Sequence, residues 1–242
     1  GFSMERTAAE LARAAWNESR NDPTLASGYG AVIEGTAISS SVDLGRVGRV
    51  DQLRVRLLGV DLTGFDLAGG RQVLKGDTLL VSTEDLARID AGYRLPYRGG
   101  GEPAEELAST PLIQASAPRI VETARRVVGE EKDPVVAATK LSEWVYGALR
   151  KEVTLSLPSA VQVLEAGRGD CNEHTVLYIA LARALGLPAR TAVGVVHVDG
   201  RFYYHAWPEV WLDGWVAVDP TLGQDPADAT HLRFLVGGQE RQ

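Results

Sequence analysis

Only one cysteine, Cys171, occurs among the 242 residues. A single cysteine excludes an internal disulfide bond and any zinc site built from several thiolates, so its sulfur is either buried filler or a reactive group. Long hydrophobic runs are missing as well, because no stretch approaches the roughly 20 apolar residues that a bilayer-spanning helix needs. We therefore expect no membrane insertion within this segment.

Basic residues are outnumbered by acidic ones. The 25 lysines and arginines stand against 32 aspartates and glutamates, which gives a net charge of −7. The sequence has no block rich in basic residues, and nucleic-acid binding depends on such clusters to neutralise phosphates. We expect no nucleic-acid partner. Hydrophobic residues make up 45% of the chain, an ordinary share for a globular protein, and this predicts a packed core.

The first part of the chain is predicted to be rich in β-strands. A helical pattern over residues 6–19 is followed by short strand patterns between residues 29 and 82. The clearest of these is a hairpin over residues 71–82, around a Gly76-Asp77 turn. A glycine-rich run over residues 98–103 predicts a flexible linker. The expected organisation is a β-rich N-terminal region of unknown role over residues 1–97, a linker over 98–110 and a second domain over 111–242.

Helix signals dominate after the linker. Residues 118–129 predict one helix, and residues 133–151 predict a second that begins with Asp133 as its N-cap and a proline in its first turn. Four residues at helical spacing mark one face of the second helix. We therefore expect Trp144 to lie in the core. The face consists of Val136, Lys140, Trp144 and Ala148, and Leu141 and Val145 fall beside it.

Cys171 is predicted to lie at the start of a third helix. It follows the glycine-punctuated run 167–170, and apolar residues repeat at helical spacing up to Leu185, after which Gly186-Leu187-Pro188 ends the pattern. The free N–H groups at a helix start favour an anion, so this position lowers the pKa of a thiol and raises its thiolate fraction. The position alone favours a reactive sulfur.

An antiparallel meander is predicted to follow, with strands over residues 189–198, 201–211 and 215–219. A two-residue turn between the last two strands would put His205 and Asp219 on opposite faces. A three-residue turn over 212–214, with its glycine in the left-handed conformation, pairs Trp211 with Trp215. His205 and Asp219 are then neighbours on one face, about 7–8 Å apart at the backbone. We expect this second register, or a bulge at Pro208 with the same effect.

Cys171, His205 and Asp219 together form a set of nucleophile, base and orienting group. The sulfur attacks a carbonyl, the imidazole of His205 takes and returns the proton, and the carboxylate of Asp219 holds the ring and stabilises its charged form. These three residues are the predicted catalytic site.

Four motifs, in this order, resemble the transglutaminase-like superfamily, a circular relative of the papain-like thiol enzymes. The resemblance covers residues 119–236, and the N-terminal part matches no family that we can name. The motifs are Gly-Asp-Cys at 169–171, Ala-Arg-Ala-Leu-Gly-Leu-Pro-Ala-Arg at 182–190, His-Ala-Trp-Pro-Glu-Val at 205–210 and Trp-Val-Ala-Val-Asp-Pro-Thr at 215–221.

The resemblance implies an α+β fold, in which helices pack on an antiparallel sheet in a papain-like or transglutaminase-like core, with the β-rich N-terminal region added. It also implies a Cys-His-Asp triad, which falls on Cys171, His205 and Asp219 without a substitution. Many bacterial members are thiol proteases or amidases. We expect an enzyme that transfers acyl groups from peptide or carboxamide bonds through a thioacyl-enzyme, with hydrolysis favoured over cross-linking.

Several alternatives stay open. The chain could be a non-catalytic binding module that retains the fold, a protein cross-linking transglutaminase, or an acyltransferase that uses a thioester donor, as arylamine acetyltransferases do. We expect a protein or peptide substrate, no cofactor and no metal. Relatives of this kind are often exported, so we expect an extracytoplasmic domain of a bacterial protein. The oligomeric state cannot be read from the sequence.

Other polar and aromatic residues receive weaker roles. Trp207 lies two residues beyond His205 and is predicted to line a substrate groove. His174, one turn beyond Cys171, is expected to cap or pack the helix start rather than to bind a metal. His231 is expected to be structural, and Gln162 is a weak candidate for stabilising an oxyanion together with the backbone N–H of Cys171.

Overall fold

A computed structural model describes residues 37–40, 44, 49–152 and 158–237. The helix predicted over residues 6–19 lies outside the described residues. Among the helices of the described part, none has the length and apolar character to cross a bilayer.

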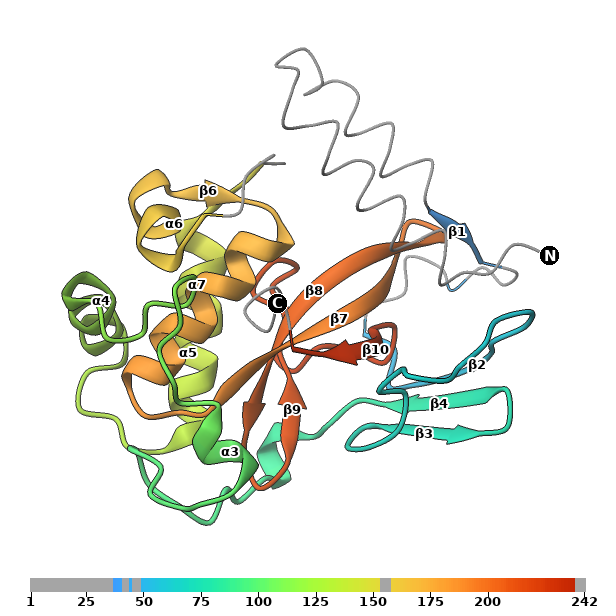
Figure 1. Ribbon diagram of the computed structural model, residues 1–242, viewed down its shortest axis with the longest axis horizontal. Coiled ribbons are helices and arrows are strands. Elements are labelled where there is room, and N and C mark those ends of the chain that lie inside the picture. The colour runs from blue at the N-terminus through green and yellow to red at the C-terminus, as the bar shows by residue number, and fades with distance from the viewer. Residues whose placement is uncertain (1–36, 41–43, 45–48, 153–157, 238–242) are drawn as a thin grey trace.

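A five-stranded antiparallel sheet forms the centre of the fold (Figure 1). The predicted meander is confirmed, with a tight turn at Asp199-Gly200 in which both residues have positive φ, 47° and 86°. The strands run in the order β1-β8-β7-β10, and β9 pairs with β8. Their bounds are β1 Ile38–Ser39, β7 Ala189–Val198, β8 Arg201–Trp211, β9 Trp215–Ala217 and β10 Leu232–Val236.

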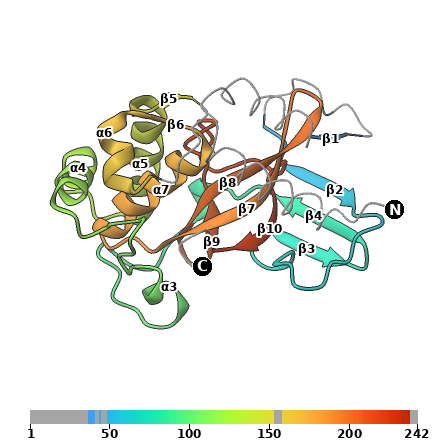
Figure 2. The ribbon, with the colours of Figure 1, turned by 45° about the horizontal axis from the view of Figure 1, so that its top comes forward.

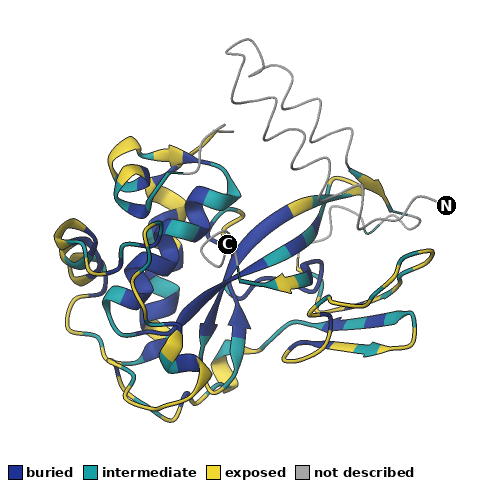
Figure 3. Cartoon of the chain, in the orientation of Figure 1, coloured by how far each residue is buried: buried dark blue, intermediate teal, exposed yellow. Residues whose placement is uncertain are grey.

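Four helices gather at one end of this sheet (Figures 1 and 2). Helix α7 lies at their centre and contacts the other three as well as β7 and β8. Most of its side chains are buried, as are those in the second half of β8 (Figure 3). The predicted fold class, helices packed on an antiparallel sheet, is therefore confirmed. The helices are α4 Pro118–Val128, α5 Pro134–Ala148, α6 Ala160–Ala166 and α7 Cys171–Ala184.

The start of α5 is as predicted, but the buried face is centred beside the predicted one, at Leu141 and Val145. Asp133 caps the helix, because its carboxylate accepts hydrogen bonds from Val135 N at 2.9 Å and Val136 N at 3.3 Å. Val136 and Ala148 are exposed, and Trp144 is only half-buried at the edge of the core. The buried face instead carries small alanines that let α5 approach α7 closely; it consists of Ala137, Ala138, Leu141, Ser142 and Val145.

A second, three-stranded sheet lies beside the central one and belongs to a segment that we call the β unit, residues 49–84. Its strands run in the order β2-β4-β3, with bounds Gln52–Arg56, Thr78–Ser82 and Gln72–Lys75. The predicted hairpin around Gly76-Asp77 is confirmed, with Gly76 at φ 59°. Leu53, Leu79 and Val81 of the β unit share one hydrophobic cluster with Ala229 and Leu232 near the end of the chain. The β unit and the central sheet therefore bury apolar side chains against each other.

The segment 98–110 is attached to the central fold. It contains a short helix, α3 (Glu102–Glu105), and Glu102 Oε1 lies 2.5 Å from an Arg190 guanidinium nitrogen. The next residue after α3, Glu106, is buried and lies 2.6 Å from Arg183 of α7. These ion pairs attach residues 102–106 to helix α7 and strand β7. The remaining short elements are a 3-10 turn over Leu86–Arg88 and the parallel pair β5 Arg150–Lys151 and β6 Arg168–Gly169.

Candidate active site

Cys171 is the first residue of α7, as predicted. Asp170 caps the helix through its Oδ1, which accepts from Asn172 N at 2.9 Å, and Glu173 Oε2 accepts from Asp170 N at 2.9 Å. This reciprocal capping box sets the first turn of the helix. The Cys171 side chain is partly exposed there, beside the free N–H groups of the helix start.

Gly169 allows the first turn of α7 to pack against β6. A Cβ at this buried position would overlap the Cβ of Glu173, the residue that closes the capping box. We expect Gly169→Ala to destabilise the fold by about 1–3 kcal/mol, because the overlap must push the helix start away. Gly147→Ala is the matched control: a Cβ there meets nothing within 4 Å. That substitution in α5 should stabilise by about 0.5–1 kcal/mol. Chemical denaturation of both variants measures the difference, and equal stabilities would contradict the packing argument.

His205 and Asp219 are brought together by the predicted register. Trp211 pairs with Trp215 across a three-residue turn. One detail of that prediction is wrong: Asp213, at φ 67°, takes the left-handed conformation, and Gly214 does not. Aspartate tolerates this region better than most residues, so the turn does not need its glycine there. Asp219 lies beyond the end of β9, and its backbone forms a bridge with Gln224.

The carboxylate of Asp219 is fully buried and accepts four hydrogen bonds. Oδ1 accepts from the backbone N–H groups of Thr221 at 2.7 Å and Leu222 at 3.0 Å. Oδ2 accepts from Nε2 of His205 at 2.8 Å and Nε2 of His231 at 2.9 Å. Burial works against the charge, but the two imidazoles outweigh it and hold the pKa of Asp219 well below its ordinary value. Asp219 is therefore an anion at neutral pH.

His205 lies between this anion and the sulfur of Cys171. Burial alone would lower the pKa of its imidazole, but the negative charge and hydrogen bond of Asp219 outweigh burial, and a side-chain hydrogen bond with Cys171 adds to them. Together they raise the pKa of His205 to about 9. The structure thus brings the three predicted residues into one hydrogen-bonded chain, with an imidazolium in the middle at neutral pH.

Asp170 differs from Asp219 in its charge state. Burial and, after it, a hydrogen bond with the side chain of Glu173 together raise the pKa of its carboxyl group to about 8. The folded protein then keeps a proton that the unfolded chain, with a pKa of about 4, has released. A protonated Asp170 also avoids a further negative charge beside Cys171.

Asp170→Asn is expected to gain stability relative to the wild type as the pH rises. Asparagine retains the capping oxygen but has no proton to lose. Wild-type stability falls between about pH 4 and pH 8, because the folded state binds more protons than the unfolded state in this window. Denaturation midpoints of both proteins at several pH values measure the effect. Parallel pH dependences would contradict the assignment of the proton to Asp170.

The prediction that Trp207 lines a substrate groove is wrong. Its side chain is only 1% exposed, stacks on the ring of His205 at a centroid distance of 5.9 Å, and meets the ring of His231 edge-on at 5.2 Å. Both faces of β8 are covered in this part of the strand, so strand alternation does not distinguish a core residue from a groove residue. Trp207 therefore packs against the rings of His205 and His231 in the interior of the protein.

Two of the remaining histidines lie at the site. His174 is buried and its Nδ1 donates to Asp170 O at 2.6 Å, as expected for a residue that packs against the helix start. His231 was expected to be structural, but it contacts the carboxylate of Asp219 directly. The sequence spacing did not indicate this contact. Gln162 Oε1 accepts from Ser159 N and Ser159 Oγ at the start of α6.

One group of ligand-type atoms in the described residues could surround a metal ion: the side chains of His205, Asp219 and His231, with their atoms within 4.8 Å of one another. Both imidazoles donate their Nε2–H to the same carboxylate oxygen. A metal ligand needs a free lone pair at that nitrogen. We interpret the arrangement as a hydrogen-bonded group in which both imidazoles donate to the shared carboxylate oxygen.

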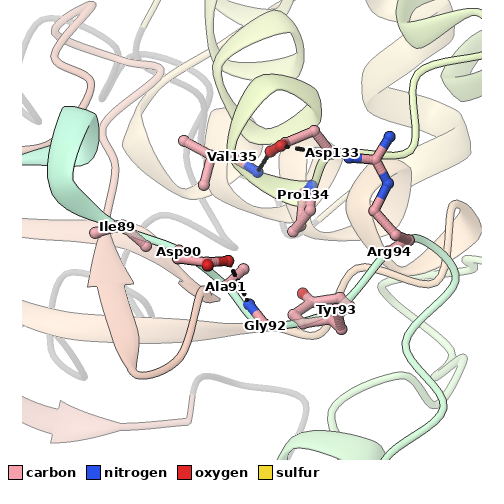
Figure 4. A pocket seen from close by; sticks show the side chains of 9 residues that line it. All are labelled: Ile89, Asp90, Ala91, Gly92, Tyr93, Arg94, Asp133, Pro134 and Val135. Atoms are coloured by element: carbon pink, nitrogen blue, oxygen red, sulfur yellow. Dashed lines mark hydrogen bonds and ion pairs between the residues drawn. The ribbon is translucent and has the colours of Figure 1, made fainter.

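A hollow of about 540 Å³ lies elsewhere, between the loop before α3 and the start of α5 (Figure 4). Cys171, His205 and Asp219 do not belong to its lining. Its lining consists of Ile89, Asp90, Ala91, Gly92, Tyr93, Arg94, Asp133, Pro134 and Val135.

Comparison with known proteins agrees with the geometry. Residues 121–220 match the family described as the transglutaminase-like superfamily. Over 104 residues the chain is 28% identical to an uncharacterized protein of Mycobacterium leprae, a match that covers 34% of this chain and 37% of that protein. The chain thus spans little more than a third of the length of this curated relative.

Two solved structures were compared with the chain, and the first has a similar fold. A protein from Cytophaga hutchinsonii, described as a candidate cysteine protease, has a TM-score of 0.54 and 16% identity, over 83% of this chain and 78% of that chain. The periplasmic domain of TgpA from Pseudomonas aeruginosa has a TM-score of 0.45 and 17% identity, over 77% of this chain and 75% of that chain. At these identities, the first match supports the fold alone.

Proposed function

We propose that the chain, whose residues 121–220 match the transglutaminase-like superfamily, is a thiol-dependent acyl-transfer enzyme that acts on peptide or carboxamide bonds. The hydrogen-bonded chain from Cys171 through His205 to Asp219 carries this proposal. The three groups have the roles of nucleophile, acid–base and orienting anion, and no cofactor is needed for them to act.

The proposed reaction has two halves. The thiolate of Cys171 attacks the carbonyl carbon, and the backbone N–H of Cys171 is the proposed donor to the oxyanion that forms. The C–N bond then breaks, and the His205 imidazolium gives its proton to the leaving amine, which leaves a thioester and a neutral imidazole. In the second half, His205 takes a proton from water, which attacks the thioester. The carboxylic acid leaves, and the proton returns the site to its ion pair.

We favour hydrolysis over cross-linking because water is always available as the acceptor of the acyl group. The proposed substrate is a protein or peptide. We place its action outside the bacterial cytoplasm, as is common among relatives of this kind. The following experiment separates hydrolysis from the alternative reactions.

The experiment has two arms. In the first, labelled iodoacetamide measures the reactivity of Cys171, the only thiol in the chain, at neutral pH. Alkylation faster than that of free cysteine supports an activated thiolate, and alkylation no faster overturns the proposal. In the second arm, a panel of peptide amides is incubated with and without a primary amine. Release of free acid in both conditions supports hydrolysis, whereas conversion to the new amide would replace it with transamidation. Acetyl-coenzyme A as donor tests the thioester alternative.

A further inference from the structure

We propose that His231 is a positioning residue of the Cys171 site and that the β unit holds it in place. This inference rests on the proposed function, because it assumes that Cys171 and His205 act as nucleophile and acid–base pair. It assigns a role to the N-terminal strands, for which the sequence indicated none.

His231 shares one carboxylate oxygen with His205. Its Nε2 lies 2.9 Å from Oδ2 of Asp219, and the His205 Nε2 lies 2.8 Å from the same atom. The other ring nitrogen, Nδ1, lies 3.3 Å from the backbone oxygen of Asp228 and 3.4 Å from its Oδ1. The side chain of His231 is completely buried. The hydrogen-bonded chain therefore extends beyond the triad, through His231 to a second carboxylate.

A space-filling role does not explain this arrangement. Burying an imidazole costs free energy unless its polar atoms are paired, and an apolar side chain would fill the space without this cost. Here both ring nitrogens of His231 face carboxylates. The ring also packs edge-on against Trp207, which stacks on His205. The surroundings of His231 thus favour an imidazole that donates a hydrogen bond to the Asp219 carboxylate.

The β unit holds the turn that carries His231. Arg71, which is 8% exposed, donates from Nη2 to the backbone oxygen of Asp228 at 2.6 Å. On the same turn, Ala229 N donates to Val50 O at 2.8 Å, and Val50 N donates to Oδ2 of Asp228 at 3.4 Å. Thr230 closes the turn from within, since its N–H donates to Oδ1 of Asp228 at 2.9 Å. Contacts from two parts of the β unit thus fix the backbone on either side of Asp228.

His231 limits how strongly Asp219 holds the His205 imidazolium. Two donors on one oxygen compete, so a hydrogen bond from His231 weakens the pull of that oxygen on the proton of His205. Several other charged or titratable groups face the two histidines or their shared carboxylate. They are Cys171, Asp228 and Arg71, and His174 lies near enough to Asp219 to interact with its charge.

Alkylation of Cys171 by iodoacetate tests the role of His231. This anionic reagent depends on the positive imidazolium, so its rate falls when His205 loses its proton. In His231→Phe, Oδ2 of Asp219 accepts a hydrogen bond from His205 only. We therefore expect the pH midpoint at which the alkylation rate falls to move up by about half a unit or more. His231→Gln places an N–H donor close to the position of Nε2 and should restore the wild-type midpoint.

The outcomes of this test are distinguishable. Loss of fold changes the amount of native protein, but it does not change the midpoint measured on the folded fraction. An unchanged midpoint in His231→Phe, or a shift that glutamine does not reverse, overturns the role of His231. Wild-type Cys171 that is no more reactive than free cysteine overturns the proposed function instead.

The role of the β unit needs a second readout. Only four histidines occur in the chain, so selective nitrogen-15 labelling resolves their ring N–H signals, and His231→Phe assigns the signal of His231. Arg71→Met removes the contact with Asp228 and should broaden or abolish this signal. Arg56→Met is the matched control, because Arg56 lies on the same β unit in an exposed ion pair with Asp77. If Arg71→Met does not fold, Arg71→Gln removes the same contact. A signal retained without Arg71 overturns the role of the β unit.

Discussion

Replacement of Cys171 by alanine should reduce turnover of any acyl substrate by about 10⁶-fold, the size of effect that removal of a catalytic nucleophile has in well-studied hydrolases. Without the sulfur there is no atom to form the thioester, and His205 and Asp219 cannot substitute for it. Because the side chain of Cys171 is partly exposed and lies at a helix start, its loss should leave the fold intact.

The control for this variant is its stability. Thermal unfolding of Cys171→Ala should match that of the wild type to within about 1 kcal/mol, as is common for surface substitutions. Cys171→Ser, which retains an oxygen at the same position, should be almost as inactive because an alcohol is far harder to ionise than a thiol. Substantial turnover by a folded alanine variant would show that the nucleophile lies elsewhere.

Asp219→Asn should reduce turnover by about 10⁴-fold, as the loss of the orienting carboxylate does in related triads. The amide is nearly the same size but carries no charge. Burial of His205 is then opposed only by the interaction with Cys171, so the pKa of this imidazole should fall from about 9 to about 6.5 or lower. The imidazolium would be lost near neutral pH.

Iodoacetate measures this shift directly. The pH at which the alkylation rate falls should move down by about two units or more in Asp219→Asn. Asp213→Asn serves as the matched control, since Asp213 is exposed in a turn whose positive φ asparagine also adopts. An alkaline midpoint that stays near 9 in Asp219→Asn would show that another group supports the charge on His205.

Local signals in the sequence were sufficient for the position of Cys171. Asp170 and Glu173 form a capping box around the helix start, and such a box depends only on residues close together in the sequence. The register of β8 and β9 was likewise predictable, because turn length fixes which residues pair. Together these two features place the nucleophile, and they orient the strand that carries His205.

The sequence did not predict contacts that depend on which face of a strand or helix is covered by other parts of the chain. The alternation along β8 places Trp207 on the same side as His205, but it does not reveal that this side is buried under the turn at residues 227–231. The face of α5 was misjudged because alanines, which permit close packing, are weaker markers of a buried face than large apolar residues. Tertiary packing determines both outcomes.

His231 was missed for a related reason. Its contact with Asp219 spans 12 residues through an irregular segment, and no periodic pattern connects the two positions. The hairpin of the β unit was predicted correctly, but its link to the site runs from Arg71 across 157 residues to Asp228. A buried arginine that donates to a backbone oxygen has no signature in a single sequence.

The rate of Cys171 alkylation by iodoacetate, measured in the wild-type protein across the pH range, tests the central claim most directly. The account predicts a bell-shaped profile that is far above free cysteine at neutral pH and falls with a midpoint near 9, as His205 loses its proton. A rate that only rises with pH, with the midpoint of an ordinary thiol, would contradict the ion pair and with it the proposed enzyme.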